Sequence, residues 1–286
     1  MDMITPMRII ELSLRHATSE GTFQSAMQLP EGIAANGFNV VYVLPWMMID
    51  RSQSSSPYAV VDYCTTDDCM GTLQDAANWI HRCHEVGLDV VLDIPLNHTS
   101  PNHIWCANAD WYSLDESGKE HAPIGTQWKD VIQLNHRNPR VADACLDVLL
   151  YWLKLGIDGF RFDAASFIPE SVLNKWLVEL SGTKHMWCDG VDLRKDHVQF
   201  TSFLNHDAIR LARTDLDAWC SIVKSNADCG ILYVTNHDTL HNGISPRQDW
   251  GNKYDYLLSL LNQSNQHFML SLSDWINPDS YYSFMS

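Results

Sequence analysis

The stretch DGFRFDAASF, residues 158–167, sets an arginine and an aspartate two positions apart at the end of a short apolar run. Alternate residues of a β-strand share one face, so Arg161 and Asp163 are expected to project side by side from the end of a strand. The fixed positive charge of Arg161 would favour the ionised form of Asp163. The stretch therefore predicts a buried strand that ends in chemically active side chains.

Seven further runs share the short, β-rich composition of this one, and longer stretches of helical period separate several of them. This alternation is typical of βα units that build a parallel sheet. The eight expected strands are residues 8–14, 39–45, 88–95, 158–163, 185–189, 198–203, 230–235 and 267–272. Because eight parallel strands can close a ring, we expect an α/β fold, a (β/α)8 TIM barrel, with residues 1–286 as one catalytic domain.

Two intervening stretches, 72–86 and 140–155, place apolar residues three and four positions apart and then run into a glycine, as outer helices of a barrel do. Residues 98–138 are long for a simple connection, so we expect a small subdomain inserted after the third strand. Few residues follow the eighth strand. The last outer helix is therefore expected to be missing, and an oligomer could cover the exposed end.

The net charge and the cysteine spacing indicate which ligands and partners the protein can bind. A formal net charge of −16 opposes binding to nucleic acid or to anionic membrane surfaces but tolerates a neutral, hydroxyl-rich ligand. The eight cysteines form neither a CxxC pair nor a metal-ligand spacing, so we expect reduced thiols and no cysteine metal site. No signal peptide and no membrane-spanning run is recognisable, which predicts a cytoplasmic location.

Polar side chains gather where four of the expected strands end, which is where barrels of this type carry their active sites. They are Asp93, Asn97 and His98, then Arg161 and Asp163, then Asp189, and finally Asn236, His237 and Asp238. A single aspartate after a strand is usually a helix cap or a loop residue. The ordered set instead suits cleavage of a glycosidic bond, in which one carboxylate attacks the anomeric carbon and a protonated carboxyl releases the leaving oxygen.

These motifs resemble those of the α-amylase family of glycoside hydrolases, family 13, and in particular a bacterial amylase-type subgroup. The resemblance runs from about residue 8 to residue 275. Four segments are similar to the ordered motifs of that family: LDIPLNH (92–98), GFRFDAA (159–165), HMWCD (185–189) and VTNHD (234–238). Residues 56–75 and 110–141 are similar to its loops.

The resemblance implies an enzyme that cleaves or transfers α-glucosidic bonds of an α-glucan or oligosaccharide by a retaining double displacement. Asp163 would be the nucleophile and Asp238 the stabiliser of the transition state. The other implied roles are sugar binding by His98 and His237, stacking by Tyr58, orientation by Arg161, and support from Asp93, Asn97 and Asn236. No cofactor is required; Asn97 is either structural or part of a calcium site of the kind that some relatives have.

The sequence departs from the family pattern at the general acid. That residue is a glutamate in the family, but here the position falls on Asp189, and no glutamate follows Glu179. A side chain one methylene shorter should slow proton transfer, which needs heavy atoms roughly 2.6–3.2 Å apart. Asp192 could act instead only if its loop folds back, and Gly190 could let the strand end shift inward. A β-sandwich domain usually follows the barrel in this family, and we expect it to be missing here.

The sequence is therefore compatible with two functions. The first is a glycoside hydrolase of the amylase or α-glucosidase type, with activity limited by Asp189. The second is a catalytically impaired amylase-like barrel that binds an oligosaccharide or a partner protein. A phosphate-binding barrel of another chemistry would need a glycine-rich turn near the last strands, and SLSDWINP (271–278) has none.

Overall fold

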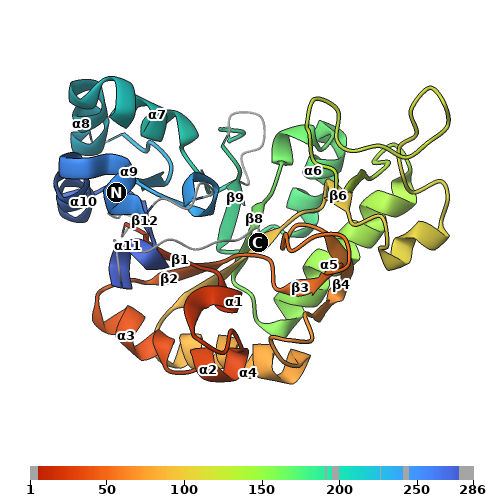
Figure 1. Cartoon of the computed structure of the whole chain (residues 1–286), viewed down its shortest axis with the longest axis horizontal. Coiled ribbons are helices and arrows are strands. Elements are labelled where there is room, and N and C mark those ends of the chain that lie inside the picture. The colour runs from red at the N-terminus through yellow and green to blue at the C-terminus, as the bar shows by residue number, and fades with distance from the viewer. Residues whose placement is uncertain (1–5, 191, 195–199, 226, 241–244, 277–286) are drawn as a thin grey trace.

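A single parallel sheet forms the centre of the protein (Figure 1). The computed structural model describes residues 6–190, 192–194, 200–225, 227–240 and 245–276. The strands lie in the order β10-β9-β8-β5-β2-β1-β12-β11. In chain order they are β1 (Arg8–Leu12), β2 (Val40–Val43), β5 (Asp89–Ile94), β8 (Gly159–Phe162), β9 (His185–Cys188), β10 (Ser202–Phe203), β11 (Leu232–Tyr233) and β12 (Phe268–Ser271). Each expected strand is present, although residues 198 and 199 of the sixth lie outside the described residues.

The sheet curls until its two edge strands meet. Leu204, just after β10, forms a parallel bridge with Ile231, just before β11. In this bridge Ile231 N donates to Phe203 O at 2.8 Å, and Asn205 N donates to Ile231 O at 3.0 Å. The ring thus closes as a (β/α)8 barrel, but this seam is one bridge long, whereas β1 pairs with β2 along the whole of Ile9 to Leu12.

Helices surround the ring. In Figure 1, α2, α3 and α4 lie below the sheet, α5 and α6 to its right, and α7 to α10 to its left. The helices are α1 (Leu14–Ala17), α2 (Phe23–Ala26), α3 (Leu29–Ala35), α4 (Leu73–Glu85), α5 (Pro139–Leu155), α6 (Glu170–Glu179), α7 (His206–Thr214), α8 (Leu216–Lys224), α9 (Pro246–Trp250), α10 (Tyr254–Gln263) and α11 (Leu272–Ile276). Short 3-10 turns are η1 (Ile104–Ala107), η2 (Ala165–Phe167), η3 (His237–Leu240) and η4 (Gly251–Lys253).

The two helices that were predicted from the spacing of apolar residues, α4 and α5, begin or end at capping residues. Thr72 and Asp75 make a reciprocal capping box at the start of α4, and the apolar face of this helix is buried. Asn138 caps α5, whose end is fixed by Gly156 at a φ of 116°, a left-handed conformation that favours glycine. Both helices cover the sheet on the side of β5 and β8, the strands that carry Asp93 and Arg161.

Residues 98–138 fold over the same side of the barrel. The segment holds two short antiparallel strands, β6 (His98–Thr99) and β7 (Ile132–Gln133), which pair with each other. A second antiparallel pair, β3 (Met47–Ile49) and β4 (Val60–Thr66), precedes it and brings Tyr58 to the barrel mouth. An edge-to-face contact between Trp105 and Trp111 supports the segment from within.

The end of the described chain partly covers the barrel between the last and first strands. The five-residue helix α11 follows β12, and the ring of Trp275 meets that of Phe38 edge to face at 5.9 Å. The expected absence of a full last helix concerns positions 277–286, which lie outside the described residues.

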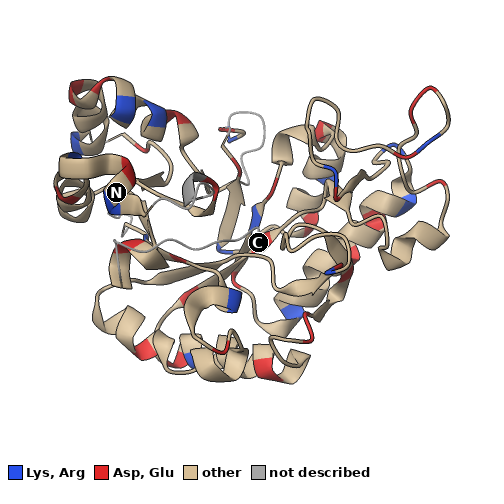
Figure 2. Ribbon diagram, viewed as in Figure 1, with Lys and Arg blue, Asp and Glu red and all other residues tan. Residues whose placement is uncertain are grey.

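The fold contains no disulfide among its eight cysteines, and its charged side chains are distributed over the surface. All eight cysteines are free thiols. Figure 2 shows acidic positions spread over the outer helices and loops in this view, not gathered on one face. None of the helices in the described part of the chain combines the length and apolar content that a bilayer crossing requires.

Candidate active site

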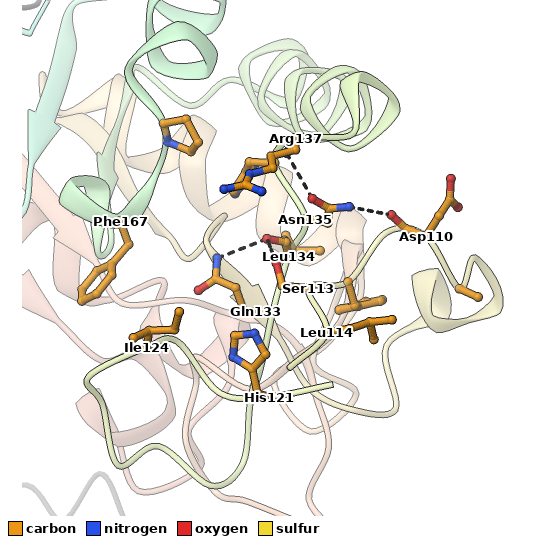
Figure 3. Close-up of a pocket in the computed structure, with 14 residues that line it drawn as sticks. Asp110, Ser113, Leu114, His121, Ile124, Gln133, Leu134, Asn135, Arg137 and Phe167 are labelled. Atoms are coloured by element: carbon orange, nitrogen blue, oxygen red, sulfur yellow. Dashed lines mark hydrogen bonds between the residues drawn. The ribbon is translucent and has the colours of Figure 1, made fainter. Parts of the chain in front are cut away.

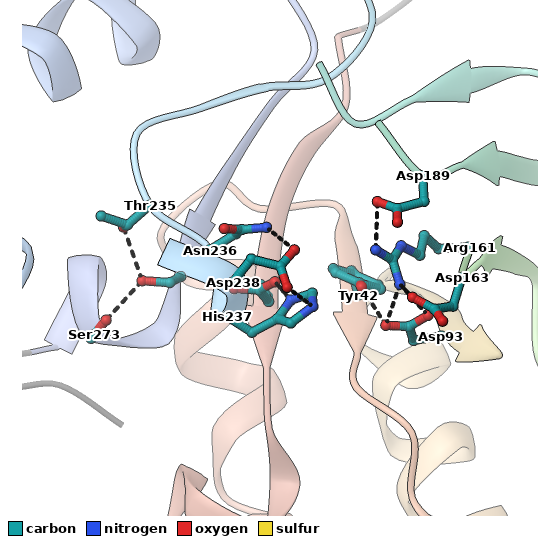
Figure 4. Close-up of polar contacts among 12 residues, drawn as sticks. Tyr42, Asp93, Arg161, Asp163, Asp189, Thr235, Asn236, His237, Asp238 and Ser273 are labelled. Atoms are coloured by element: carbon teal, nitrogen blue, oxygen red, sulfur yellow. Dashed lines mark hydrogen bonds and ion pairs between the residues drawn. The ribbon is translucent and has the colours of Figure 1, made fainter. Parts of the chain in front are cut away.

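Arg161 lies at the centre of the site because the strand register puts it there. β5 and β8 pair so that Asp93 is directly opposite Arg161, and both side chains are buried. Arg161 Nη1 donates to Asp93 Oδ1 at 2.9 Å and to Asp163 Oδ1 at 2.8 Å. Its other nitrogen, Nη2, lies 2.6 Å from Asp189 Oδ1. One buried guanidinium therefore holds three carboxylates from three neighbouring strands, as Figure 4 shows.

Both carboxylate oxygens of Asp93 accept hydrogen bonds from side chains of this network. Tyr42 Oη donates to Asp93 Oδ2 at 2.7 Å, and Tyr58 Oη donates to the same oxygen at 2.8 Å. Burial raises the pKa of both tyrosines well above the usual value, so both keep their hydroxyl protons. With Arg161 as its third donor, Asp93 acts as a support and has no free oxygen for a substrate.

His237 is held as a cation by two acids. Its Nδ1 lies 2.8 Å from Glu11 Oε1, and its Nε2 lies 2.8 Å from Tyr58 Oη. Burial alone would lower the pKa of His237, but Asp238 and Glu11 outweigh it and raise that pKa to about 9. Glu11 and Tyr42 were missed by the sequence analysis. The signal was available, because a glutamate inside the apolar run RIIEL needs a partner when it is buried.

Several predicted residues line one cavity of about 610 Å³ at the C-terminal ends of the strands. They are Tyr58, His98, Asp163, His237 and Asp238. Asn236 is buried beneath, and its Nδ2 donates to Asp238 Oδ2 at 3.2 Å. The cavity wall also includes Trp128 and Asp130, which lie in the inserted segment and were not singled out from the sequence.

Asp189 is the one predicted catalytic residue outside the lining of this cavity. Its carboxylate turns towards Arg161, and His206 Nε2 approaches Asp189 Oδ1 at 3.3 Å. Gly190 allows this approach: its φ is +67°, and a Cβ there would lie 2.6 Å from His206 Nδ1. The room that Gly190 leaves is thus filled by His206.

Asp192 does not take over from Asp189. It forms a two-point ion pair with Arg194, with Nε 2.8 Å from Asp192 Oδ1 and Nη2 2.9 Å from Oδ2. Arg194 in turn contacts Asp228. Asp192 is therefore held by Arg194 and does not line the cavity that contains Asp163, as the alternative assignment requires.

The proton affinities of the two central acids differ strongly. Burial raises the pKa of Asp163 to about 7, because Asp93, Asp189 and Asp238 add to the burial effect while Arg161 offsets it only in part. Burial also acts on Asp189, but Arg161 and then His206 hold its pKa well below the usual range. In the free protein the carboxyl that takes up a proton more readily is therefore Asp163.

The surroundings of Asn97 do not fit a calcium ion. Gln133 Nε2 donates to Asn97 Oδ1 at 2.8 Å, to Asn97 O at 3.0 Å and to Leu134 O at 3.2 Å. Oxygen atoms are the ligands that Ca²⁺ requires, and here an amide N–H group stands among three of them. Within the described ranges, no group of three or more His, Cys, Asp or Glu side chains could hold a metal.

A family model supplies the wider context for this geometry. The model described as the alpha-amylase catalytic domain matches residues 21–130 and 124–206, together more than half of the chain. The chain belongs to the alpha-amylase family. Three of the four motif segments lie wholly within the matched residues, and the fourth, VTNHD, follows them.

Individual curated proteins match parts of the chain. Alpha-amylase 3 of Dictyoglomus thermophilum is 32% identical over 144 residues, which is 43% of this chain and 29% of the relative. The amino acid transporter heavy chain SLC3A1 of Homo sapiens is 30% identical over 148 residues, 40% of this chain and 22% of the relative. These matches span less than a third of the curated relatives.

A solved structure matches much more of the chain. The alpha-amylase from Lactobacillus plantarum superposes with a TM-score of 0.79 at 21% identity, covering 93% of this chain and 71% of that one. This likeness shows that the two share the amylase-type barrel fold.

Proposed function

We propose that this protein is a glycoside hydrolase or transglycosylase that acts on α-glucosidic bonds of an α-glucan or oligosaccharide with retention of configuration. The observation that carries the proposal is the shared cavity, which collects Asp163, Asp238 and two histidines at the C-terminal ends of the strands. Its volume of about 610 Å³ is within the usual range for small-molecule sites. Family membership supports the same chemistry.

In the proposed reaction, a carboxylate oxygen of Asp163 attacks the anomeric carbon and forms a glycosyl-enzyme ester, while a proton passes to the leaving oxygen. Water then cleaves the ester, or a sugar hydroxyl does so in transfer. Arg161 offsets in part the burial that raises the pKa of Asp163, so a share of Asp163 is ionised at neutral pH. Asp238 and the cation of His237 bind sugar hydroxyls on the other side of the cavity. The ring of Tyr58 offers an apolar face to the sugar.

Asp189, the proposed proton donor, lies in surroundings that oppose its protonation. A general acid must carry a proton at working pH, yet the ion pair with Arg161 favours the ionised form of Asp189. Productive protonation requires Asp189 to release Arg161 and turn towards the cavity. We therefore propose that activity on unactivated substrates is low and that proton delivery limits it.

Lengthening the acid should relieve this limit. In Asp189→Glu, the extra methylene lets the carboxyl extend past the guanidinium, and we expect kcat/KM for maltooligosaccharides to rise on the order of tenfold or more. Asp192→Glu is the matched control and should have little effect, because Asp192 is paired with Arg194. A folded Asp189→Glu protein with unchanged or lower activity would argue against the acid role.

An activated aryl α-glucoside separates the proposed enzyme from the impaired barrel. Its leaving group hardly needs a proton, so turnover should persist even where maltooligosaccharides react slowly. Oligosaccharide binding without turnover of either substrate would favour the non-catalytic function instead.

We propose further that Asn97 is structural and that Gln133 takes the place a cation would need. Chelation by EDTA should then leave the Tm of the wild type unchanged. Gln133→Glu would set a carboxylate against three carbonyl oxygens and should cost about 1–3 kcal/mol without metal. Millimolar Ca²⁺ should recover that loss, because the new site is all oxygen. Gln263→Glu, at the exposed end of α10, is the control; a fall in the wild-type Tm on chelation would contradict the proposal.

We also propose, from charge, length and the order of the strands, four further features of the protein. They are one catalytic domain over residues 1–286 with residues 98–138 inserted, a cytoplasmic location, no nucleic-acid or membrane partner, and an oligomer that covers the open end of the barrel.

A further inference from the structure

One buried nitrogen atom beside Asp189 has no hydrogen bond of good geometry. It is Nε2 of His206, which reaches Asp189 Oδ1 at 3.3 Å but is hydrogen-bonded to none of the described residues. In the wall of a second cavity, of about 690 Å³, Ser113 Oγ and Gln133 Nε2 instead both donate to Leu134 O (Figure 3). A buried polar atom without a hydrogen bond calls for a reason, and a role in proton transfer is one.

The ring of His206 is held against Asp189 from several sides. A Cβ at Gly190 would lie 2.6 Å from Nδ1 of the ring and 2.9 Å from its Cε1, so only glycine leaves this space. Asn205 caps α7 with its side chain, which fixes His206 at the first position of the helix. Tyr233, on β11, meets the ring edge to face at a centroid distance of 6.1 Å, and burial raises the pKa of this tyrosine well above the usual value.

The charged groups that face His206 are acids of the site and one arginine. Asp189 Oδ1 is shared between His206 Nε2 and Arg161 Nη2, which lies 2.6 Å from it. Burial would raise the pKa of Asp238, but nearby bases, His237 first and His206 among them, keep it below the usual value. Imidazole is the side chain that gains and loses a proton near neutral pH. A proton on Nε2 therefore points at the carboxylate that the proposed mechanism needs in its protonated form.

We propose that His206 is the proton source of Asp189, an inference that rests on the proposed function because it needs a leaving oxygen. In the first step, Nε2 of the imidazolium gives its proton to Asp189 as this carboxyl leaves Arg161. Asp189 passes a proton to the glycosidic oxygen while the bond from that oxygen to the anomeric carbon breaks and Asp163 bonds to the carbon. In the second step, water displaces Asp163 and loses a proton to Asp189, which returns one to Nε2. His206 is thus a positioning residue that acts through Asp189 and does not touch the sugar.

The test compares two leaving groups in His206→Gln, because glutamine keeps an N–H donor of similar reach but cannot release a proton. We expect kcat/KM for maltotriose to fall about ten- to a hundredfold, a part of what general acid catalysis contributes. For 4-nitrophenyl α-glucoside, whose leaving group hardly needs a proton, kcat/KM should stay within about twofold, which also shows that the variant is folded. His84→Gln is the matched control: it removes a similar contact, 2.7 Å to Asp158, before β8 and should change neither value.

The pH profile gives a second readout, which a purely structural role would not change. In the wild type, kcat/KM for both substrates should rise near pH 7 as Asp163 ionises, because its pKa is about 7. For maltotriose alone, kcat/KM should fall again at higher pH as His206 loses its proton, and in His206→Gln this fall should be absent. A fall near pH 9 that both substrates share would come from His237, whose pKa is about 9.

The possible outcomes separate this inference from the proposed function. Wild-type kcat/KM for maltotriose in His206→Gln would overturn the inference alone, because the glutamine has no proton to give. An equal loss on both substrates would also overturn it, since His206 would then only support the site. A wild type that turns over neither substrate would refute the proposed function, and the inference with it.

Discussion

Asp163→Asn should lower turnover of an activated aryl α-glucoside by roughly a thousandfold or more, because the amide cannot form the ester intermediate. Asparagine keeps the size of aspartate and can still accept the hydrogen bond from Arg161 Nη1. Saccharide binding should therefore persist. Initial rates and calorimetric titration on the same preparation measure the two effects.

Two controls make this result specific to a nucleophile. Asp207→Asn, at an exposed site on α7, should retain wild-type turnover. In Asp163→Gly, added azide should restore turnover of the aryl glucoside by attacking the anomeric carbon from the vacated side and should yield the product of inverted configuration. Rescue without inversion, or full activity of Asp163→Asn, would show that another group attacks the sugar.

Arg161→Met should give the largest loss of stability. The substitution leaves Asp93, Asp163 and Asp189 without their shared cation in a buried site, and breaking a buried ion pair in this way costs about 3–5 kcal/mol. For a chain of this length the Tm should fall by roughly 10 °C. Thermal unfolding at neutral pH measures the change.

Arg210→Met is the matched control for this loss. Arg210 makes an exposed pair with Asp207 on one helix, and such pairs contribute about 0–1 kcal/mol. Arg161→Lys should recover only part of the stability, because one ammonium group cannot reproduce a planar fork that binds three carboxylates. A Tm change in Arg161→Met no larger than in Arg210→Met would show that the carboxylates do not depend on Arg161.

The fold could be predicted because the information is local. Each strand is a short apolar run, and α4 and α5 carry their own capping residues. The neighbourhood of Arg161 and Asp163 was predictable for the same reason, since alternation along one strand fixes it. The seam between β10 and β11 was not, because it depends on how far the whole sheet curls.

The sequence does not predict the direction in which a side chain of the site points. The sequence gives the position of Asp189 but not that its carboxylate turns towards Arg161 and His206 and not into the cavity. That choice depends on Gly190, whose missing Cβ admits a ring from a helix that begins sixteen residues later. The contact of Gln133 with Asn97 likewise needs the fold of the whole inserted segment.

The single bridge at Leu204 and Ile231 closes the ring between two strands that are each followed by a side chain of the site. His206, which contacts Asp189, follows the strand on one side of this bridge, and Asp238 follows the strand on the other. A saccharide that contacted groups after both strands would hold together the two strands that share the fewest hydrogen bonds in the sheet. Saccharide binding would then stabilise the pairing between β10 and β11. Without a ligand, this pairing would open more often than it does in the complex.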